Sequence, residues 1–190
     1  MNWASNGYFK LHEKCRKMVR KPLADREGIW TELQTANDRA AVILAATFVE
    51  EAILEAIIDS LKIERADALE ELIGNNAPLG TFSNKIMIAH CVGIIGEKAR
   101  RDLNVIRRIR NIAAHQMEPF SLNENRFRDM TSHFSVRYYP MVAHQPHELP
   151  ESPRERYVET CEKIAMRLDR CGWTIVSRCS AGEKRPPEAD

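Results

Sequence analysis

The sequence has no strong excess of charge of either sign and no long apolar run. Its 28 lysine and arginine residues nearly balance 27 acidic residues, which leaves a formal net charge of +1. A charge this small gives no general attraction to nucleic acid, so any such binding must come from a local patch. No apolar run of about 18 residues occurs, which argues against a membrane partner. The start Met1–Ser5 lacks the features of a secretory signal, and we expect a cytoplasmic protein.

The cysteines also lack a recognisable pattern. They are odd in number, irregularly spaced and without a Cys-x-x-Cys pair: Cys15, Cys91, Cys161, Cys171 and Cys179. We therefore expect reduced, mostly packed thiols and no zinc site. Of the histidines His133, His144 and His147, the last two form a His-x-x-His step that could bind a metal, but no carboxylate or thiol accompanies them at matched spacing. We expect neither a metal nor another cofactor.

Helical periodicity is present along most of the chain, whereas no strand pattern of useful length is found. A length of 190 residues with 44% apolar residues suits one well-packed domain. We predict an all-α fold, a single helical bundle domain over residues 1–179. The polar, proline-rich tail, residues 180–190, is expected to be disordered.

Proline, glycine and capping residues predict where the helices begin and end. Ser83 is expected to be the N-cap of the helix that begins at Asn84. The connection over residues 118–153 is expected to be irregular or partly helical. The expected helices are Trp3–Lys21, Asp25–Lys62 with a break near Asn37, Arg65–Ile73, Asn84–Gly93, Glu97–Gln116 and Pro153–Arg178.

The second half of the long helix is apolar around most of its circumference, which places it in the centre of the bundle. We expect Ile43 and Ile53 to be almost completely buried. The remaining polar stripe, with residues four apart, is predicted to face solvent: Glu51, Glu55 and Asp59.

The helix over residues 97–116 carries the densest group of chemically versatile side chains. Leu103, Ile106, Ile109 and Ala113 recur at intervals of three and four and predict its core face. The polar residues that should then point outward are Arg107, Asn111 and His115.

Arg110 borders this outward stripe. A guanidinium binds phosphate with two hydrogen bonds, and an imidazole transfers protons near neutral pH, so Arg110 and His115 could act on one anionic ligand. The alternative is structural: Asn111 and a cationic His115 would answer the exposed carbonyls at the helix end.

Two groups of basic residues could form local patches, although each could equally be a solvated helix face. The first group is Lys10, Lys14, Arg16, Lys17, Arg20 and Lys21. The second is Lys98, Arg100, Arg101, Arg107, Arg108 and Arg110.

Several blocks of this sequence resemble, in order and spacing, the mannitol operon repressor (MtlR) family over about residues 36–122. The resemblance implies an all-helical protein that regulates transcription, and it departs at Ile112-Ala113, where the family tends to have Asp-Phe. The Arg-Asn-x-x-Ala-His ending also resembles the Arg-x4-6-His motif of the HEPN superfamily, which consists of helical dimers that include metal-independent endoribonucleases. The blocks are Asp38–Ile43, Phe48–Glu51, Pro78–Lys85 and Leu103–His115.

Residues within these blocks are the candidates for a site. We predict that Asp38 and Arg39, polar residues at the start of an apolar helix, either hold the bundle or border the site. Together with Lys85 and Arg107 they are the candidate ligand-binding residues. In a ribonuclease, the catalytic residues would be Arg110, Asn111 and His115.

Two functions therefore stay open. The first is a regulator that binds a partner protein or nucleic acid and has no catalytic activity. The second is a HEPN-like ribonuclease, in which His115 takes the proton of a ribose 2′-hydroxyl, Arg110 stabilises the phosphate and Asn111 orients either group. The outward stripes of the helix over residues 97–116 favour a homodimer in both cases.

Overall fold

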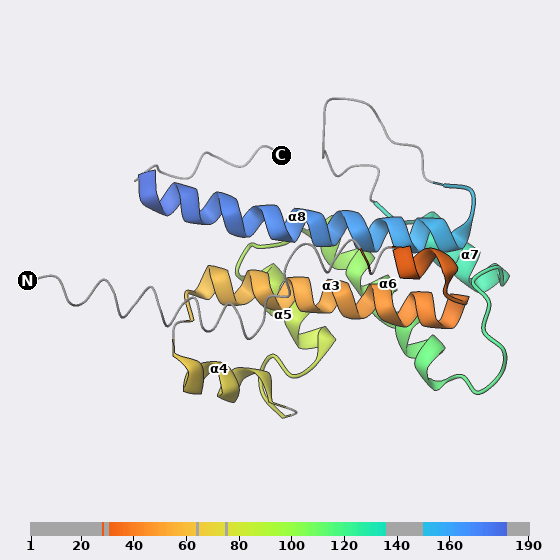
Figure 1. Ribbon diagram of the computed structural model, residues 1–190, viewed down its shortest axis with the longest axis horizontal. Coiled ribbons are helices and arrows are strands. Elements are labelled where there is room, and N and C mark those ends of the chain that lie inside the picture. Colours follow the sequence, from red (N-terminus) through yellow and green to blue (C-terminus); the bar gives the residue numbers. More distant parts are fainter. Residues whose placement is uncertain (1–27, 29–30, 64, 75, 136–149, 182–190) are drawn as a thin grey trace, which may run out of the picture.

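The computed structural model describes residue 28 and residues 31–63, 65–74, 76–135 and 150–181, with side chains as far as Leu168. Within these ranges all regular structure is helical and no strand is present, which confirms the predicted all-α class (Figure 1). The helices are α3 (Asp38–Leu61), α4 (Ala66–Ile73), α5 (Phe82–Cys91), α6 (Glu97–His115), α7 (Asn125–Ser132) and α8 (Pro153–Ala181). None of them is both long enough and apolar enough to cross a membrane.

Helix α3 is the centre of the bundle, as its apolar circumference predicts. It packs against α8, α6 and α5, and α8 runs beside it along most of its length (Figure 1). Its small buried residues, Ala41, Ala45, Ala46 and Ala52, have no bulky side chains that would hold the neighbouring helices away. Larger residues such as Ile53, which has no exposed surface, fill the space between the helices.

Two expectations about α3 are wrong. Ile43 is only partly buried, at the edge of the core. Glu55, expected on a solvent-facing stripe with Glu51 and Asp59, is only 8% exposed. Because α3 has helices packed on several sides, a polar position on its sequence pattern does not by itself identify a face in contact with water.

Hydroxyl and amide side chains fix two helix starts. Asn37 interrupts the long helical pattern as predicted, and its Oδ1 accepts a hydrogen bond from Ala40 N at 2.9 Å. The start of α5 lies two residues earlier than predicted. Thr81, not Ser83, is its N-cap, and Thr81 Oγ1 accepts from Asn84 N at 3.1 Å. The buried Phe82 becomes the first helical residue and turns into the core.

The connection after α6 contains a regular element. Helix α7 buries Phe127, and Phe134 packs beyond its end with its ring centroid 6.5 Å from that of Tyr157. Helix α8 buries Tyr157, Cys161, Ile164 and Leu168 against the rest of the bundle. Cys91, in contrast, is exposed. Several predicted features lie outside the described residues: the helix Trp3–Lys21, residues 136–149 with His144 and His147, and residues 182–190 of the tail.

The complete burial of Ile53 leads to a stability prediction. Ile53→Ala should lower the free energy of unfolding by about 2–5 kcal/mol, because it leaves a cavity between α3 and its neighbours. Ile43→Ala, at a partly exposed position on the same helix, should cost less. Urea denaturation followed by circular dichroism measures both variants. Equal losses at the two positions would contradict the placement of α3.

Candidate functional site

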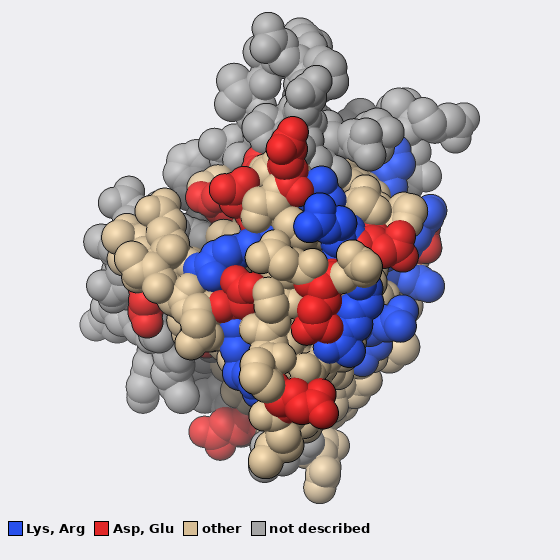
Figure 2. Space-filling model, turned by 90° about the vertical axis from the view of Figure 1, so that its right-hand side faces the viewer, with Lys and Arg blue, Asp and Glu red and all other residues tan. Residues whose placement is uncertain are grey.

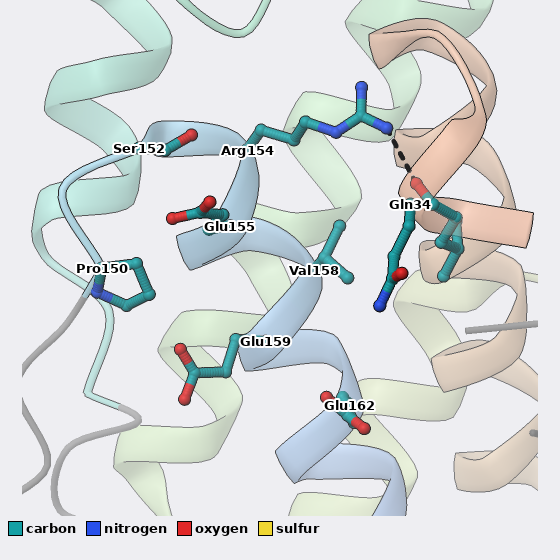
Figure 3. Close-up of a pocket in the computed structure, with 9 residues that line it drawn as sticks. Gln34, Pro150, Ser152, Arg154, Glu155, Val158, Glu159 and Glu162 are labelled. Carbon is teal, nitrogen blue, oxygen red and sulfur yellow. Dashed lines mark hydrogen bonds between the residues drawn. The ribbon is translucent and has the colours of Figure 1, made fainter. Parts of the chain in front are cut away.

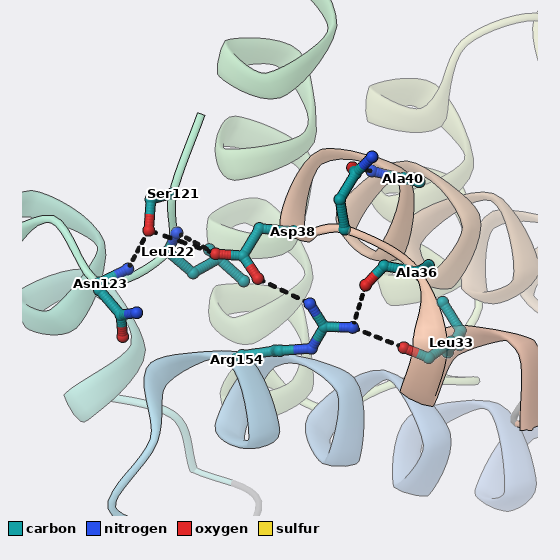
Figure 4. Close-up of polar contacts among 9 residues, drawn as sticks. Leu33, Ala36, Asp38, Ala40, Ser121, Leu122, Asn123 and Arg154 are labelled. Atoms are coloured by element: carbon teal, nitrogen blue, oxygen red, sulfur yellow. Dashed lines mark hydrogen bonds and ion pairs between the residues drawn. The ribbon is translucent and has the colours of Figure 1, made fainter. Parts of the chain in front are cut away.

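Asp38, the first residue of α3, joins three segments that are far apart in the sequence (Figure 4). Its Oδ1 lies 2.7 Å from Arg154 Nη1 on α8, and its Oδ2 accepts from Leu122 N at 2.8 Å and from the Ser121 hydroxyl. Arg154 Nη2 also donates to the carbonyls of Leu33, at 2.8 Å, and Ala36. The Asp38–Arg154 pair thus connects the starts of α3 and α8 with the chain on both sides of them.

Arg39, the next residue, turns to the end of α6. Its Nη1 donates to Ala113 O at 3.1 Å and to Gln116 O at 2.6 Å, and its Nη2 donates to Glu118 O. These carbonyls belong to the end of α6 and the turn beyond it, where helix hydrogen bonding runs out. Of the two roles expected for Asp38 and Arg39, the contacts show the first: both residues hold the bundle together.

The contacts of Arg39 also concern the expectation that Asn111 and His115 bond the exposed carbonyls at the end of α6. Arg39, and not Asn111 or His115, bonds the Ala113 carbonyl in the last turn of α6 and the carbonyl of the C-cap residue Gln116. His115 is exposed and makes no hydrogen bond or ion pair with another described residue. The imidazole therefore does not serve as a cap within the described part of the chain.

A cluster of charges lies where α3, α5 and α6 meet. Lys85 Nζ on α5 lies 2.7 Å from Glu50 Oε1 on α3, and the two side chains are only 12% and 16% exposed. Arg110 Nη2 on α6 lies 3.8 Å from Glu50 Oε2, and Arg110 Nη1 donates to Asn111 Oδ1 at 3.2 Å. Three predicted site residues, Lys85, Arg110 and Asn111, thus come together.

Glu50, which links Lys85 and Arg110, was not among the predicted site residues. The available signal was its position within the block Phe48–Glu51, as one of a few carboxylates on a mostly apolar helix. Glu50 is largely buried and is shared by two cations, so the three side chains together carry one excess positive charge. An anionic ligand would have to compete with the Glu50 carboxylate for Arg110.

Arg110 and His115, which were expected to act on one anionic ligand, lie on different sides of α6. An α-helix turns by about 100° per residue, so side chains five residues apart point about 140° away from each other. Arg110 points towards α3 and Glu50, whereas His115 lies on the exposed side of α6. A shared site would need groups from elsewhere.

The exposed side of α6 carries a row of basic residues at intervals of seven, Arg101, Arg108 and His115, which we call the α6 outer stripe. Seven residues make nearly two helical turns, so these side chains line up. Arg101 shares Glu97 with Arg100, each at 3.5 Å. Arg108 and His115 have no such partner among the described residues.

Arg107, predicted to point outward, is only partly exposed. Its Nε is buried and has no hydrogen-bond partner within the described ranges. The reason is its place on α6, between the core face and the outer stripe. The arginine stem is long enough to cover apolar surface while the guanidinium reaches the edge.

The face that is turned towards the viewer in Figure 2 has basic and acidic side chains next to one another. This face therefore does not offer the broad basic surface typical of non-specific nucleic-acid binding. Among the described residues, no group of three or more histidine, cysteine and acidic side chains is arranged to hold a metal ion.

Comparison with known proteins adds no relative. No protein-family model, no curated protein and no solved structure matches this chain. The roles considered below therefore depend on the residues and their contacts.

The Asp38–Arg154 pair can be tested by a double-mutant cycle. Asp38→Ala should lower the free energy of unfolding by about 1–3 kcal/mol, because it removes the acceptor of Leu122 N and the partner of Arg154. The coupling energy with Arg154→Ala should be about 0.5–3 kcal/mol in urea denaturation. The exposed pair Arg65–Asp67 is the control and should show a smaller coupling energy, because water screens it. Additive effects of Asp38→Ala and Arg154→Ala would contradict the link.

A second comparison separates the two residues at the end of α6. His115→Ala should change the free energy of unfolding by no more than about 0.5 kcal/mol, as expected for an exposed residue without partners. Arg39→Ala should cost about 1–3 kcal/mol, because it removes the donor to several carbonyls. Thermal melts and urea titrations measure both. Strong destabilisation by His115→Ala would show that the imidazole is a structural cap after all.

Proposed function

We propose that this chain is a regulatory protein, similar to the MtlR family, that binds a partner protein or nucleic acid and has no catalytic activity of its own. The observation that carries the proposal is the position of Arg110. Its guanidinium lies against Glu50 and Asn111 and points away from His115. This placement of Arg110 supports a regulator over a ribonuclease whose arginine and histidine act together in one chain.

A binding role needs only an accessible surface with uncommitted groups, and the α6 outer stripe offers one. Arg108 and His115 are exposed and have no partner among the described residues. Two apolar residues beside the stripe, Val105 and Ile112, are only partly buried. Such a mixture of cationic and apolar groups suits a protein surface or a nucleic-acid strand. We propose that the same face also joins two chains in a homodimer.

The ribonuclease is kept as a second candidate because of His115. An exposed imidazole without a structural partner is available for proton transfer. Since His115 and Arg110 diverge within one chain, catalysis would need the two groups to come from different chains. A mixed dimer of two inactive variants, one with His115→Ala and one with Arg110→Ala, would then regain activity.

The experiment that separates the two candidates uses purified full-length protein and a mixed pool of structured and single-stranded RNA, with a chelator present. For a regulator we expect no cleavage by wild-type protein. If the partner is nucleic acid, fluorescence anisotropy should show that labelled RNA or DNA binds more weakly to Arg108→Gln and His115→Ala. The loss should be about 1 kcal/mol for each phosphate contact, and it should shrink as salt is added.

The matched controls are His133→Ala and Arg128→Gln, exposed residues of α7 and its C-terminal end. They should leave binding unchanged, since they lie off the α6 outer stripe. A cleavage ladder that disappears with His115→Ala but persists with His133→Ala would overturn the regulator in favour of the ribonuclease.

A further inference from the structure

A groove runs between the first turns of α8 and the residues that precede α3 (Figure 3). Its volume is about 510 Å³. Pro150 and Val158 supply apolar surface, the buried Leu33 lies behind it, and the carboxylates come from α8. Glu155, Glu159 and Glu162 follow each other at helical intervals, so they line one side of the groove along nearly two turns.

The charge of this groove is mainly negative. Among the described residues that line it, Arg154 is the one cation, and it is bonded to Asp38 and to the carbonyls of Leu33 and Ala36. Glu159 is paired with Lys163. Neither Glu155 nor Glu162 forms a hydrogen bond or ion pair with another described residue. Burial, and then the neighbouring Glu159, raise the pKa of Glu162, and they outweigh the opposite effect of Lys163.

We propose that this groove binds the chain's own basic segment, residues 10–21. The segment combines six cations with apolar residues such as Leu11, Met18 and Val19. Its lysines and arginines complement Glu155 and Glu162, and its apolar residues complement Pro150 and Val158. The cations are Lys10, Lys14, Arg16, Lys17, Arg20 and Lys21.

The connection between segment and groove is short. Lys21 precedes Leu33 by twelve residues, and Leu33 itself forms part of the groove wall. Twelve residues span at most about 40 Å when fully extended, and less in any other conformation. The linker therefore keeps the segment at a high effective concentration beside the groove, which favours binding within one chain over capture of another chain. This inference does not depend on the proposed regulatory function.

Photo-crosslinking of the full-length protein tests the proposal. A benzophenone amino acid is placed at Met18, the protein is irradiated, and the crosslinked peptides are mapped by mass spectrometry. We expect crosslinks mainly to residues 150–163 and to Leu33 and Gln34. Their yield should fall by about fivefold in Glu155→Gln/Glu162→Gln, as two charge contacts are lost, and also in 1 M salt, where charges are screened beyond about 3 Å.

The matched control is Glu70→Gln/Glu71→Gln on α4, which removes two exposed carboxylates from another helix and should leave the yield unchanged. Glutamine retains the helix propensity of glutamate, and circular dichroism verifies that both double variants are folded. Mixing 14N- and 15N-labelled protein shows whether crosslinks join one chain or two.

Three results would overturn the proposal. The first is a crosslink pattern that is scattered or centred away from the groove. The second is an unchanged yield in Glu155→Gln/Glu162→Gln. The third is a predominance of mixed-isotope products, which would make a second copy of the chain the occupant.

Discussion

The arrangement of the described helices depends on the ion pair between Asp38 and Arg154. It sits where α3 and α8 both begin, and Figure 1 shows that the two helices then run in the same direction. The carbonyls of Leu33 and Ala36 and the backbone N–H of Leu122 bond to the same two side chains. The side chains are 19% and 26% exposed, so water screens the pair less than a surface salt bridge.

Two successive residues, Asp38 and Arg39, bond different segments at this end of the bundle. Asp38 connects α3 with α8 and the segment after α6, whereas Arg39 bonds the carbonyls at the end of α6. This division has a consequence for the motif at the end of α6. Arg39 bonds the carbonyls of Ala113 and Gln116, whereas the His115 side chain is exposed and has no hydrogen-bond or ion-pair partner in the described part of the chain.

The charged residues thus fall into two kinds, those that pair at a largely buried place and those that lie at the surface without a paired partner. Glu50 pairs with both Lys85 and Arg110 at a largely buried junction of three helices. Arg108 and His115 remain uncommitted on the α6 outer stripe, and Glu155 and Glu162 remain so along the groove beside α8. The net charge of the chain, +1, does not reveal these separate regions of opposite sign. The two surface regions, which differ in sign, are where we propose that partners and the basic segment bind.

The sequence by itself determined the helical class, the break at Asn37, the core face of α6 and the central place of α3. These features depend on periodicity and capping, which are local properties of the chain. Only the tertiary structure decided that Glu55 is buried, that Arg110 faces Glu50 and that Arg39 answers the end of α6. Each of these depends on which residue lies opposite in space, often tens of residues away, and periodicity along one helix carries no information about its partner.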